Sequence, residues 1–384
     1  MSFSVEEVRF LAAHRAEIDE VAPALSLTRA AMISDRKILD KRFGTYARAV
    51  MGLLGGRRAA AGKFPGEWLT DFHAAQQATP VPVAHLRARR IAAAGAGRLH
   101  DVTCSVGTEA PAAAEAGLAW LGSDLDSARV LMARHNLGPD AWLARADALA
   151  PVTRDAVVVA DPARRDGGNR IADPAKLQPP LPDLLAAYRG RELAVKCAPG
   201  IDYSEWDGLV SVVSVDGAVK EACLYTPGLA GGLAREAAVL RSDGFTDIVT
   251  SASREDEAEL EVGEPGAYIV EPDGAVIRAG LVRAFGARHG LWMLDPHIAF
   301  LTGDAIPAGY SAFPVLEAVP LRGLKAALRP YGAGSLEILV RGVDVNPDKL
   351  RASLKLKGKR PMAVVVARVG TSAVAYVCGA RERA

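Results

Sequence analysis

The chain has 384 residues, of which 50% are apolar and 24% are charged. This length predicts two or three domains, and the composition excludes a disordered tail, a collagen-like fibre and a disulfide-stapled miniprotein. The formal net charge is +1, so the protein as a whole is not a basic nucleic-acid binder. No apolar run approaches the roughly 18 residues of a membrane span, and we expect no signal peptide, because the acidic start MSFSVEEV lacks an apolar core.

The four cysteines and seven histidines predict no metal site. Neither CxxC nor HExxH occurs, and no histidine stands at zinc-binding spacing from a cysteine. Scarce cysteine without an export signal predicts a protein of the reducing cytoplasm.

Charge is distributed unevenly along the chain. The net charge is +5 over residues 1–95, −13 over residues 96–319 and +9 over residues 320–384. An acidic middle between basic ends indicates an anionic partner held by the ends. For the first segment, a solvated surface is the plainer interpretation.

Residues 1–95 are expected to form an N-terminal helical domain, because apolar residues recur at three- and four-residue spacing. Its last helix is expected over residues 83–94. From residue 98, short apolar runs alternate with helical stretches, which predicts a parallel sheet covered on both faces in a domain over residues 96–228. The expected strands are 99–103, 119–123, 141–144, 156–160 and 192–196, with helices over 110–116 and 127–136.

Two apolar runs, LVSVVSV and AVKEACLY, flank Asp216-Gly217. Asp-Gly supplies the positive φ angles of a tight turn, so these runs predict a hairpin. Five parallel strands closed by a hairpin would be an unusual end for a dinucleotide-binding fold.

Two small α+β modules are expected in the remainder, over residues 229–310 and 311–384. Residues 228–260 are rich in Gly and Glu and give no clear pattern. The first module is expected to hold the strand AYIVEP, a helix over 275–287 and a strand near 297–301. The second is expected to hold the strand PVLEAV, a helix over 321–331, the strand SLEILVRG, a helix over 346–354 and a hairpin of MAVVVARVG and SAVAYVCG.

The chemistry begins at the turn after the first predicted strand of the sheet. This turn is rich in small residues, which allow a backbone to approach a ligand at the carboxyl end of an open α/β sheet. It contains Asp101, Cys104, Ser105, Gly107 and Glu109, and it lacks the GxGxxG dinucleotide fingerprint. A tight β–α connection without a ligand is the competing interpretation.

Acidic residues follow the next three strands. Asp124 ends the second strand, where a carboxylate can accept both hydroxyls of a ribose, and Asp126 suits a helix cap. Asp147 follows the third strand and can take the amino group of an adenine, or it is a solvent-facing loop residue. The fourth strand leads into Asp161-Pro162-Ala163-Arg164, a rigid tip whose arginine can meet phosphate or carboxylate.

Together these pieces resemble class I S-adenosylmethionine-dependent methyltransferases over about residues 98–226. The resemblance implies a Rossmann-like sheet of seven strands ending in an antiparallel hairpin, with S-adenosylmethionine as cofactor. It implies that the turn from Asp101 to Glu109, with Cys104, Ser105 and Gly107, holds the methionine part of the cofactor. It also places Asp124 on the ribose and Asp147 on the adenine, and it gives Asp161, Pro162 and Arg164 the catalytic position facing the target. The pair Cys104-Ser105 departs from the usual glycine-rich motif.

A narrower resemblance covers nearly the whole chain. QQAT, ADPARR, VKCAPG, YIVEPDGAVIRAGL, LDPHIAFLTGD and LEILVRGVDVNPDKLRASLKLKGKRP are similar to a bacterial methyltransferase family with an N-terminal helical region, a ferredoxin-like module and a C-terminal THUMP-like domain. THUMP domains are associated with RNA, mainly tRNA. We therefore expect Lys355, Lys357, Lys359 and Arg360 to bind RNA, against the alternative of a solvated basic face.

The residues that follow Asp161 also bear on the acceptor atom. Asp161-Pro162 lacks the following aromatic residue of many enzymes that methylate exocyclic amines, and is closer to enzymes that methylate a ring position of a base. Methylation of carbon 5 needs a cysteine nucleophile. Cys197 stands at the end of the fifth strand, although a buried packing role is the more ordinary interpretation.

The main hypothesis is a cytoplasmic S-adenosylmethionine-dependent methyltransferase that modifies a base of tRNA or rRNA. Catalysis would hold the methyl group in line with the acceptor, and a duplexed base would first be flipped out. The alternatives are a nicotinamide-dependent oxidoreductase, an RNA-binding protein with a catalytically idle methyltransferase domain, and a methyltransferase for a small molecule or a protein. No membrane or metal partner is expected, and the oligomeric state stays open.

Overall fold

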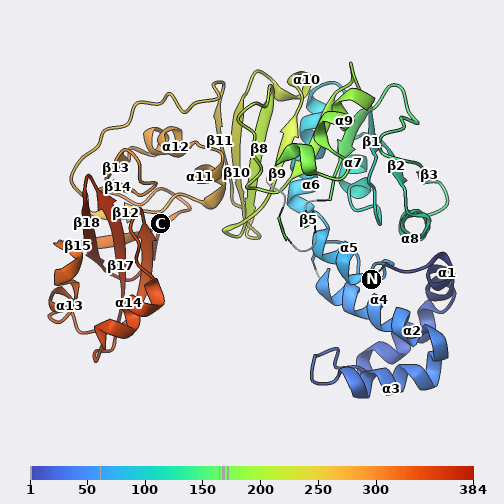
Figure 1. The fold of residues 1–384 in the computed structure, drawn as a ribbon, viewed down its shortest axis with the longest axis horizontal. Coiled ribbons are helices and arrows are strands. Elements are labelled where there is room, and N and C mark those ends of the chain that lie inside the picture. The colour runs from blue at the N-terminus through green and yellow to red at the C-terminus, as the bar shows by residue number, and fades with distance from the viewer. Residues whose placement is uncertain (1, 61, 164, 167–168, 171–172) are drawn as a thin grey trace. The chain divides into compact units, whose positions relative to one another are not determined.

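The computed structural model describes residues 2–60, 62–163, 165–166, 169–170 and 173–384. Its contacts divide the chain into two compact units (Figure 1). The first comprises residues 1–213 and 220–232, and the second comprises residues 214–219 and 233–384. No described helix is long and apolar enough to cross a membrane. The finer division into four domains stays a prediction.

The first unit contains one part of a nine-stranded sheet, and the strands in this part follow the order β8-β9-β7-β4-β1-β2-β3. The five strands from β7 to β3 are parallel, and β9 runs antiparallel to β7. These seven strands have the predicted Rossmann-like arrangement, with five parallel strands followed by a hairpin, although the complete sheet has nine strands where seven were expected. Its strands are β1 (Arg98–Asp101), β2 (Ala119–Asp124), β3 (Trp142–Arg145), β4 (Val157–Ala160), β7 (Leu193–Cys197), β8 (Leu209–Val215) and β9 (Ala218–Tyr225).

Burial explains why these segments are strands. Every residue of β4 and β7 is buried, as expected for central parallel strands covered on both faces. The parallel register brings the ends of β1, β2 and β4 together, since Asp101 is the partner of Gly122 on one side and Val159 on the other. The polar residues that follow these strands therefore share one edge of the sheet.

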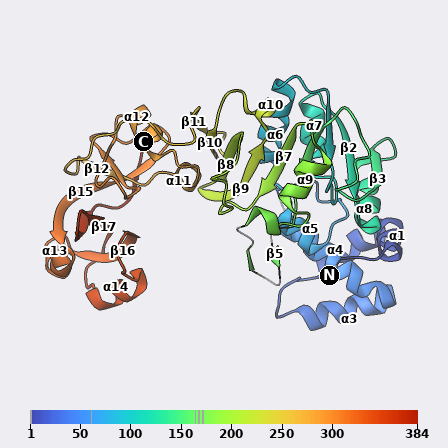
Figure 2. The ribbon, with the colours of Figure 1, turned by 45° about the horizontal axis from the view of Figure 1, so that its top comes forward.

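Helices pack around this sheet and continue into an N-terminal cluster, α1–α4, that lies beside α5 and α8 in both views (Figures 1 and 2). The helices are α1 (Val5–Ala13), α2 (Arg15–Val21), α3 (Met32–Phe43), α4 (Ala47–Ala59), α5 (Phe72–Gln77), α6 (Val81–Ala93), α7 (Ala110–Glu115), α8 (Ser127–Leu137), α9 (Leu181–Ala187) and α10 (Pro227–Ala230). Short 3-10 helices lie at Ala22–Ala24, Gly44–Tyr46 and Pro174–Lys176, and β5 (Arg165–Asp166) pairs with β6 (Asn169–Arg170).

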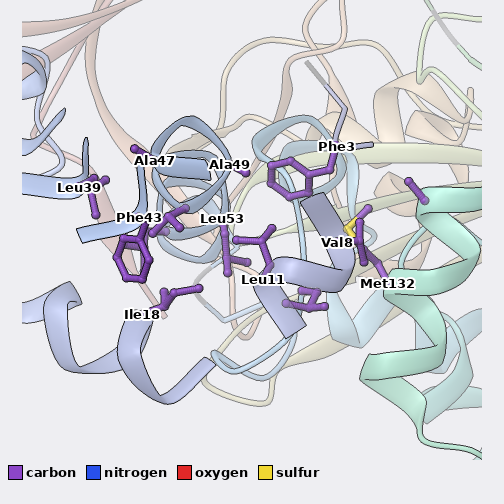
Figure 3. Close-up of a cluster of buried hydrophobic side chains, with 14 of the residues drawn as sticks. Phe3, Val8, Leu11, Ile18, Leu39, Phe43, Ala47, Ala49, Leu53 and Met132 are labelled. Carbon is purple, nitrogen blue, oxygen red and sulfur yellow. The ribbon is translucent and has the colours of Figure 1, made fainter. Parts of the chain in front are cut away.

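One hydrophobic core joins the N-terminal helices to the sheet region. Val8 and Leu11 of α1 are fully buried. Val8 lies beside Met132 of α8, and Leu11 lies beside Leu53 of α4 (Figure 3). Val106, from the turn after β1, belongs to the same cluster. The N-terminal helices therefore pack directly on the part of the sheet domain that carries the predicted cofactor turn.

The second unit contains a mixed sheet with the order β13-β14-β12-β15-β18-β17-β16, in which β16 and β17 are parallel and β19 pairs with β15. Its strands are β10 (Arg235–Leu240), β11 (Thr246–Ser251), β12 (Tyr268–Val270), β13 (Trp292–Met293), β14 (Leu301–Gly303), β15 (Ser311–Pro320), β16 (Ala333–Arg341), β17 (Arg360–Val369), β18 (Ser372–Cys378) and β19 (Glu382–Arg383). Its helices are α11 (Gly274–Arg278), α12 (Val282–His289), α13 (Leu324–Ala327), which follows a 3-10 turn at Leu321–Gly323, and α14 (Pro347–Leu354).

The structure differs from the sequence prediction in several places in this unit. The strands β13 and β19 lie outside the predicted strands, and the helix expected over 321–331 is a 3-10 turn followed by the short α13. The antiparallel pair β10–β11 lies in the segment that gave no clear pattern. The single helix expected over 275–287 is two helices, because Gly280 adopts a φ of 72° between α11 and α12.

Candidate active site

The turn between β1 and α7 is held in a strained, compact form. Ser105 and Gly107 have positive φ angles of 50° and 91°. The φ of Gly107 favours glycine, and a Cβ there would lie 2.7 Å from Cδ1 of Leu137 and would displace that side chain. Cys104 is buried, and its backbone N–H donates to the carbonyl of Ser123 at the end of β2. The turn therefore presents backbone, with few bulky side chains, at the edge of the sheet.

Asp124 is tied to this turn. One of its carboxylate oxygens accepts the backbone N–H of Ser105 at 3.0 Å, and the other accepts that of Asp126 at 2.9 Å. Each carboxylate oxygen has a second acceptor site, so both can still take a hydroxyl of a ligand. Burial raises the pKa of Asp124. Asp126 caps α8 by accepting the N–H of Ala128 at 2.8 Å, which confirms its predicted capping role, and the ribose role of Asp124 stays a prediction.

Asp101 is a buried carboxyl group directly behind the turn. It is 4% exposed, and it accepts the N–H of Thr103 at 3.2 Å. Burial raises its pKa to about 8, and the Glu109 carboxylate adds to the rise. A buried carboxyl of this kind is suited to a ligand that brings a positive charge.

Asp147 has no hydrogen bond to Asp101, Asp124 or the turn after β1 among the contacts of the described residues. It is exposed, and its carboxylate accepts the N–H of Leu149 within its own turn. The neighbouring Ala146 donates its N–H to the carbonyl of Asp124, so the turn after β3 adjoins the end of β2. The assignment of Asp147 to an adenine stays a prediction.

Asp161 and Lys196 form an ion pair at the ends of β4 and β7. Nζ of Lys196 lies 2.8 Å from the Asp161 carboxylate and 3.2 Å from the Glu109 carboxylate. The backbone N–H of Asp161 donates to Oγ1 of Thr103 at 2.7 Å, which ties the tip of β4 to the cofactor turn. Burial alone would lower the pKa of Lys196, but the carboxylates of Asp161 and Glu109 raise it above its ordinary value.

The pair continues into a chain of buried charges. Nη1 of Arg87, on α6, donates to both oxygens of Glu109 at 2.8 Å, and its Nη2 donates to Glu221 on β9. Arg87, Lys196, Glu109 and Glu221 are each at most 4% exposed. Burial would raise the pKa of Glu109, but Arg87 and Lys196 lower it. We call Asp161–Lys196–Glu109–Arg87–Glu221 the charge chain.

A cavity of about 700 Å³ opens at the two ends of this chain, where Asp161 and Glu221 reach its wall. We call it the acceptor pocket. Its polar wall also includes Lys63, His73 and Lys220. Pro80, Pro162 and Pro199 contribute apolar faces to this wall. The segment QQAT, residues 76–79, supplies the part of the wall between α5 and α6. The remaining lining residues are Ala59 and Ala198.

The wall of the acceptor pocket is clamped to the cofactor turn. The Asn136 side chain accepts the N–H of Leu69 at 2.7 Å and donates to the carbonyls of Leu69 and Val106, both at 3.0 Å. Arg129 donates to Oγ of Ser105 at 2.6 Å and lies 3.6 Å from the carboxylate of Asp71, which caps α5. The segment that leads into α5 is therefore fixed against the turn that precedes α7.

Other predicted residues lie elsewhere. Arg164 is outside the described residues. Cys197 has no solvent exposure and its Sγ faces the carbonyl of Val195, so it packs within β7 and does not line the acceptor pocket. In the second unit, Lys355 and Lys357 line a groove considered below, and Lys359 and Arg360 are exposed just after it.

Comparisons with known proteins decide the family. Residues 310–380 match the family model described as THUMP domain-like. Uncharacterised S-adenosylmethionine-dependent methyltransferases from two strains of Mycobacterium tuberculosis are each 48% identical over 361 residues, which cover 88% of this chain and 98% of the relative. The chain belongs to the S-adenosylmethionine-dependent methyltransferases. The methyltransferase also shares its fold with the crystal structure of a candidate methyltransferase from Porphyromonas gingivalis, at a TM-score of 0.74, 15% identity and full coverage of both chains.

The cofactor of the methyltransferase is S-adenosylmethionine, and the residues of the site fit it. Asp124 would offer one acceptor site per oxygen to the two ribose hydroxyls, and the buried Asp101 would suit the ammonium of the methionine part. Glu109, by contrast, has both oxygens engaged by Arg87 and Lys196. When bound, the cofactor supplies an electrophilic methyl group, and this family membership replaces the alternative of a nicotinamide-dependent oxidoreductase.

Sequence reasoning missed most of the charge chain. A signal was present, because Lys196 and Glu221 stand inside apolar runs that were read as strands, and Arg87 lies on a predicted helix. A charge at a buried strand position needs a partner of opposite sign. The sequence, however, does not tell which charges meet, since Arg87 and Glu221 are 134 positions apart.

Proposed function

We propose that this methyltransferase transfers the methyl group of S-adenosylmethionine to a base of RNA. The observation that carries the proposal is a cationic groove in the THUMP-like region. Lys325, Arg329, Lys355 and Lys357 line a cavity of about 490 Å³ whose described lining contains no carboxylate. Phosphates are bound by such groups, and apolar surface between them suits the bases. That surface comes from Leu328, Leu354 and Leu356.

The groove is built by a rigid local structure. Lys355 ends α14 with a positive φ of 47°. The backbone N–H of Gly358 donates to the carbonyl of Ala333 at 3.0 Å, and a Cβ on Gly358 would lie 1.8 Å from the carbonyl oxygen of Gly332. This close approach fixes the loop that carries Lys355 and Lys357. Lys325 and Arg329, which the sequence prediction did not include, add two charges from another segment.

RNA affinity should depend on this groove. Replacing Lys325, Lys355 and Lys357 together with Gln should weaken binding of labelled total tRNA and flatten the plot of log affinity against log salt by about two, because each phosphate contact contributes roughly −0.7 for single strands. Fluorescence anisotropy at several salt concentrations measures both effects. Cofactor affinity should not change.

A matched triple variant, Arg36→Gln, Lys37→Gln and Lys41→Gln, removes three cations from α3 and serves as the control. The proposal for the groove fails if the groove variant keeps the affinity and salt slope of the native protein. If the α3 variant loses the slope in its place, the RNA contact lies on the N-terminal helices.

Cofactor binding should depend on Asp124. Asp124→Ala should weaken S-adenosylmethionine at least about tenfold, because a charge-assisted contact to hydroxyls contributes about 1.5–3 kcal/mol. Isothermal titration calorimetry measures the change, and Asp140→Ala, which removes an exposed carboxylate from the turn before β3, is the control. An unchanged affinity for Asp124→Ala would remove this residue from the ribose site.

The product itself tests the whole proposal. Mass spectrometry of nucleosides from total tRNA and rRNA should show one methylated base that is missing in a deletion strain and returns when the purified enzyme is added. If the enzyme binds cofactor but no nucleoside changes, the alternative of a catalytically idle RNA-binding protein gains support.

A further inference from the structure

The acceptor pocket has a carboxylate at each end of the charge chain, and each carboxylate is anchored from behind by one buried cation. Lys196 holds Asp161 at 2.8 Å, and Arg87 holds Glu221. Glu109 lies between the two cations and pairs with both. The chain contains three carboxylates and two cations, so its formal charge is negative.

In the Asp161–Lys196 ion pair, the carboxylate faces the pocket and the ammonium is enclosed behind it. Asp161 reaches the pocket with a side chain that is 24% exposed, whereas the Lys196 side chain is 5% exposed and is enclosed by Asp161 and Glu109. Lys196 is not among the residues that line the pocket. Lys196 therefore stands behind Asp161 and outside the pocket lining, and it acts on the reaction through its ion pairs with Asp161 and Glu109.

We propose that Lys196 is a positioning residue for methyl transfer, and that it fixes Asp161 as a carboxylate so that the pocket takes a base nitrogen that carries its own hydrogen. The inference rests on the proposed RNA substrate and names the class of acceptor atom. Each carboxylate oxygen has two acceptor sites, so Asp161 can accept an N–H from the base while it stays paired with Lys196. The backbone N–H of Asp161, held by Thr103 at 2.7 Å, prevents the tip of β4 from shifting.

The step balances with these groups alone. The N–CH3 bond forms as the S–CH3 bond breaks, and the bonding electron pair stays with sulfur, which becomes a thioether. The nitrogen gains positive charge, and the negative charge chain stabilises that charge as it develops. The nitrogen then loses its proton to Asp161 and from there to water. A methylated nitrogen cation is a strong acid, so the weak basicity of an ion-paired carboxylate is sufficient.

The same features disfavour the other acceptor atoms. A ribose hydroxyl must lose its proton during transfer and needs a stronger base than a carboxylate held by an ammonium. A ring carbon needs a covalent nucleophile, and Cys197 is fully buried within β7. The rings of Pro80, Pro162 and Pro199 supply the flat apolar surface that a base requires in a pocket whose described lining has no Phe, Tyr or Trp.

The charged and titratable groups around Asp161 come from several elements. Behind it stand Lys196 on β7, Glu109 before α7, Arg87 on α6 and Asp101 on β1. In the pocket stand Lys63, His73, Lys220 and Glu221. Removal of Lys196 changes the environment of Asp161 most directly, because its Nζ lies 2.8 Å from the Asp161 carboxylate. The double variant with Asp161→Asn separates this effect from effects on Glu109 and Asp101, which Lys196 also influences.

The test compares pH profiles of kcat/KM with tritiated S-adenosylmethionine and total RNA from the deletion strain. Lys196→Met should lower the rate at least about 30-fold at pH 7 and add a new acid limb, because Asp161 without its ammonium is protonated at higher pH. In the double variant with Asp161→Asn the new limb should vanish. Lys196→Arg should keep the native profile at a reduced rate, and Lys176→Met, at a lysine that is 76% exposed, should leave rate and profile unchanged.

Several outcomes overturn the inference while leaving RNA as substrate. They are a Lys196→Met profile with no new acid limb, an acid limb that persists in the double variant, or a labelled nucleoside methylated on carbon or on the ribose oxygen. If Lys196→Met does not fold, as judged by circular dichroism and cofactor affinity, an acid limb in Lys196→Arg overturns the inference instead. If native enzyme labels no RNA nucleoside, the proposed function itself is wrong, and the inference fails with it.

Discussion

Asp161→Ala should lower kcat at least about 100-fold while changing the Kd of S-adenosylmethionine less than about threefold. Asp161 lines the acceptor pocket, and its carboxylate would meet the acceptor nitrogen where positive charge develops, so its loss should affect the transition state more than cofactor binding. Single-turnover kinetics with labelled cofactor and calorimetry measure the two quantities separately.

Asp124→Ala is the matched comparison for this prediction, because it should weaken the cofactor without a comparable loss at saturating cofactor. Equal damage to turnover and cofactor affinity in Asp161→Ala would show that Asp161 belongs to the cofactor site. In that case the acceptor pocket would be served by Glu221 alone among the carboxylates that the structure describes in its wall.

Arg87→Met should cost about 3–5 kcal/mol of folding free energy and lower Tm by about 10 °C, because it leaves Glu109 and Glu221 buried without this cation. The loss of folding free energy caused by Arg87→Met should be smaller at acidic pH. Burial would raise the pKa of Glu109, but Arg87 and Lys196 lower it. Stability from a lowered carboxyl pKa is present above the unfolded value of about 4.3 and is lost as the pH falls through the folded value.

Arg36→Met is the control for this effect. It removes an arginine that forms an exposed pair with Asp40 at 2.7 Å on α3, and such a pair contributes about 0.5 kcal/mol or less. Thermal and urea unfolding of both variants at pH 4 and pH 7 check the prediction. A loss below about 1 kcal/mol for Arg87→Met at pH 7 would show that the charge chain does not stabilise the fold.

The sheet and its cofactor edge could be predicted because local sequence carries them. Central parallel strands such as VVVA at 157–160 are continuous apolar runs, and the polar residue after each run marks its carboxyl end. Asp101, Asp124 and Asp161 were found this way. Their grouping at one edge follows from the parallel order of strands.

The charge chain could not be assembled from the sequence, because its members come from α6, the turn before α7, the end of β4, β7 and β9. The family resemblance assigns Glu109 to the cofactor because it lies in the turn after β1. In the structure, its side chain pairs with Arg87 and Lys196. The strand β10 was missed for a related reason. Arg235 and Glu236 are buried in it, whereas charged residues ordinarily indicate an exposed segment.

The hydrogen bonds of Asn136 also affect how cooperatively the protein unfolds and where its chain can be cut without loss of structure. One side chain joins Leu69 to Val106, and the core shared by α1 and α8 continues this contact. A chain truncated before β1 would expose Met132 and lose the QQAT wall of the acceptor pocket. The N-terminal helices and the sheet should therefore unfold as one cooperative block, and recombination that exchanged either part alone would separate a cofactor site from the pocket it serves.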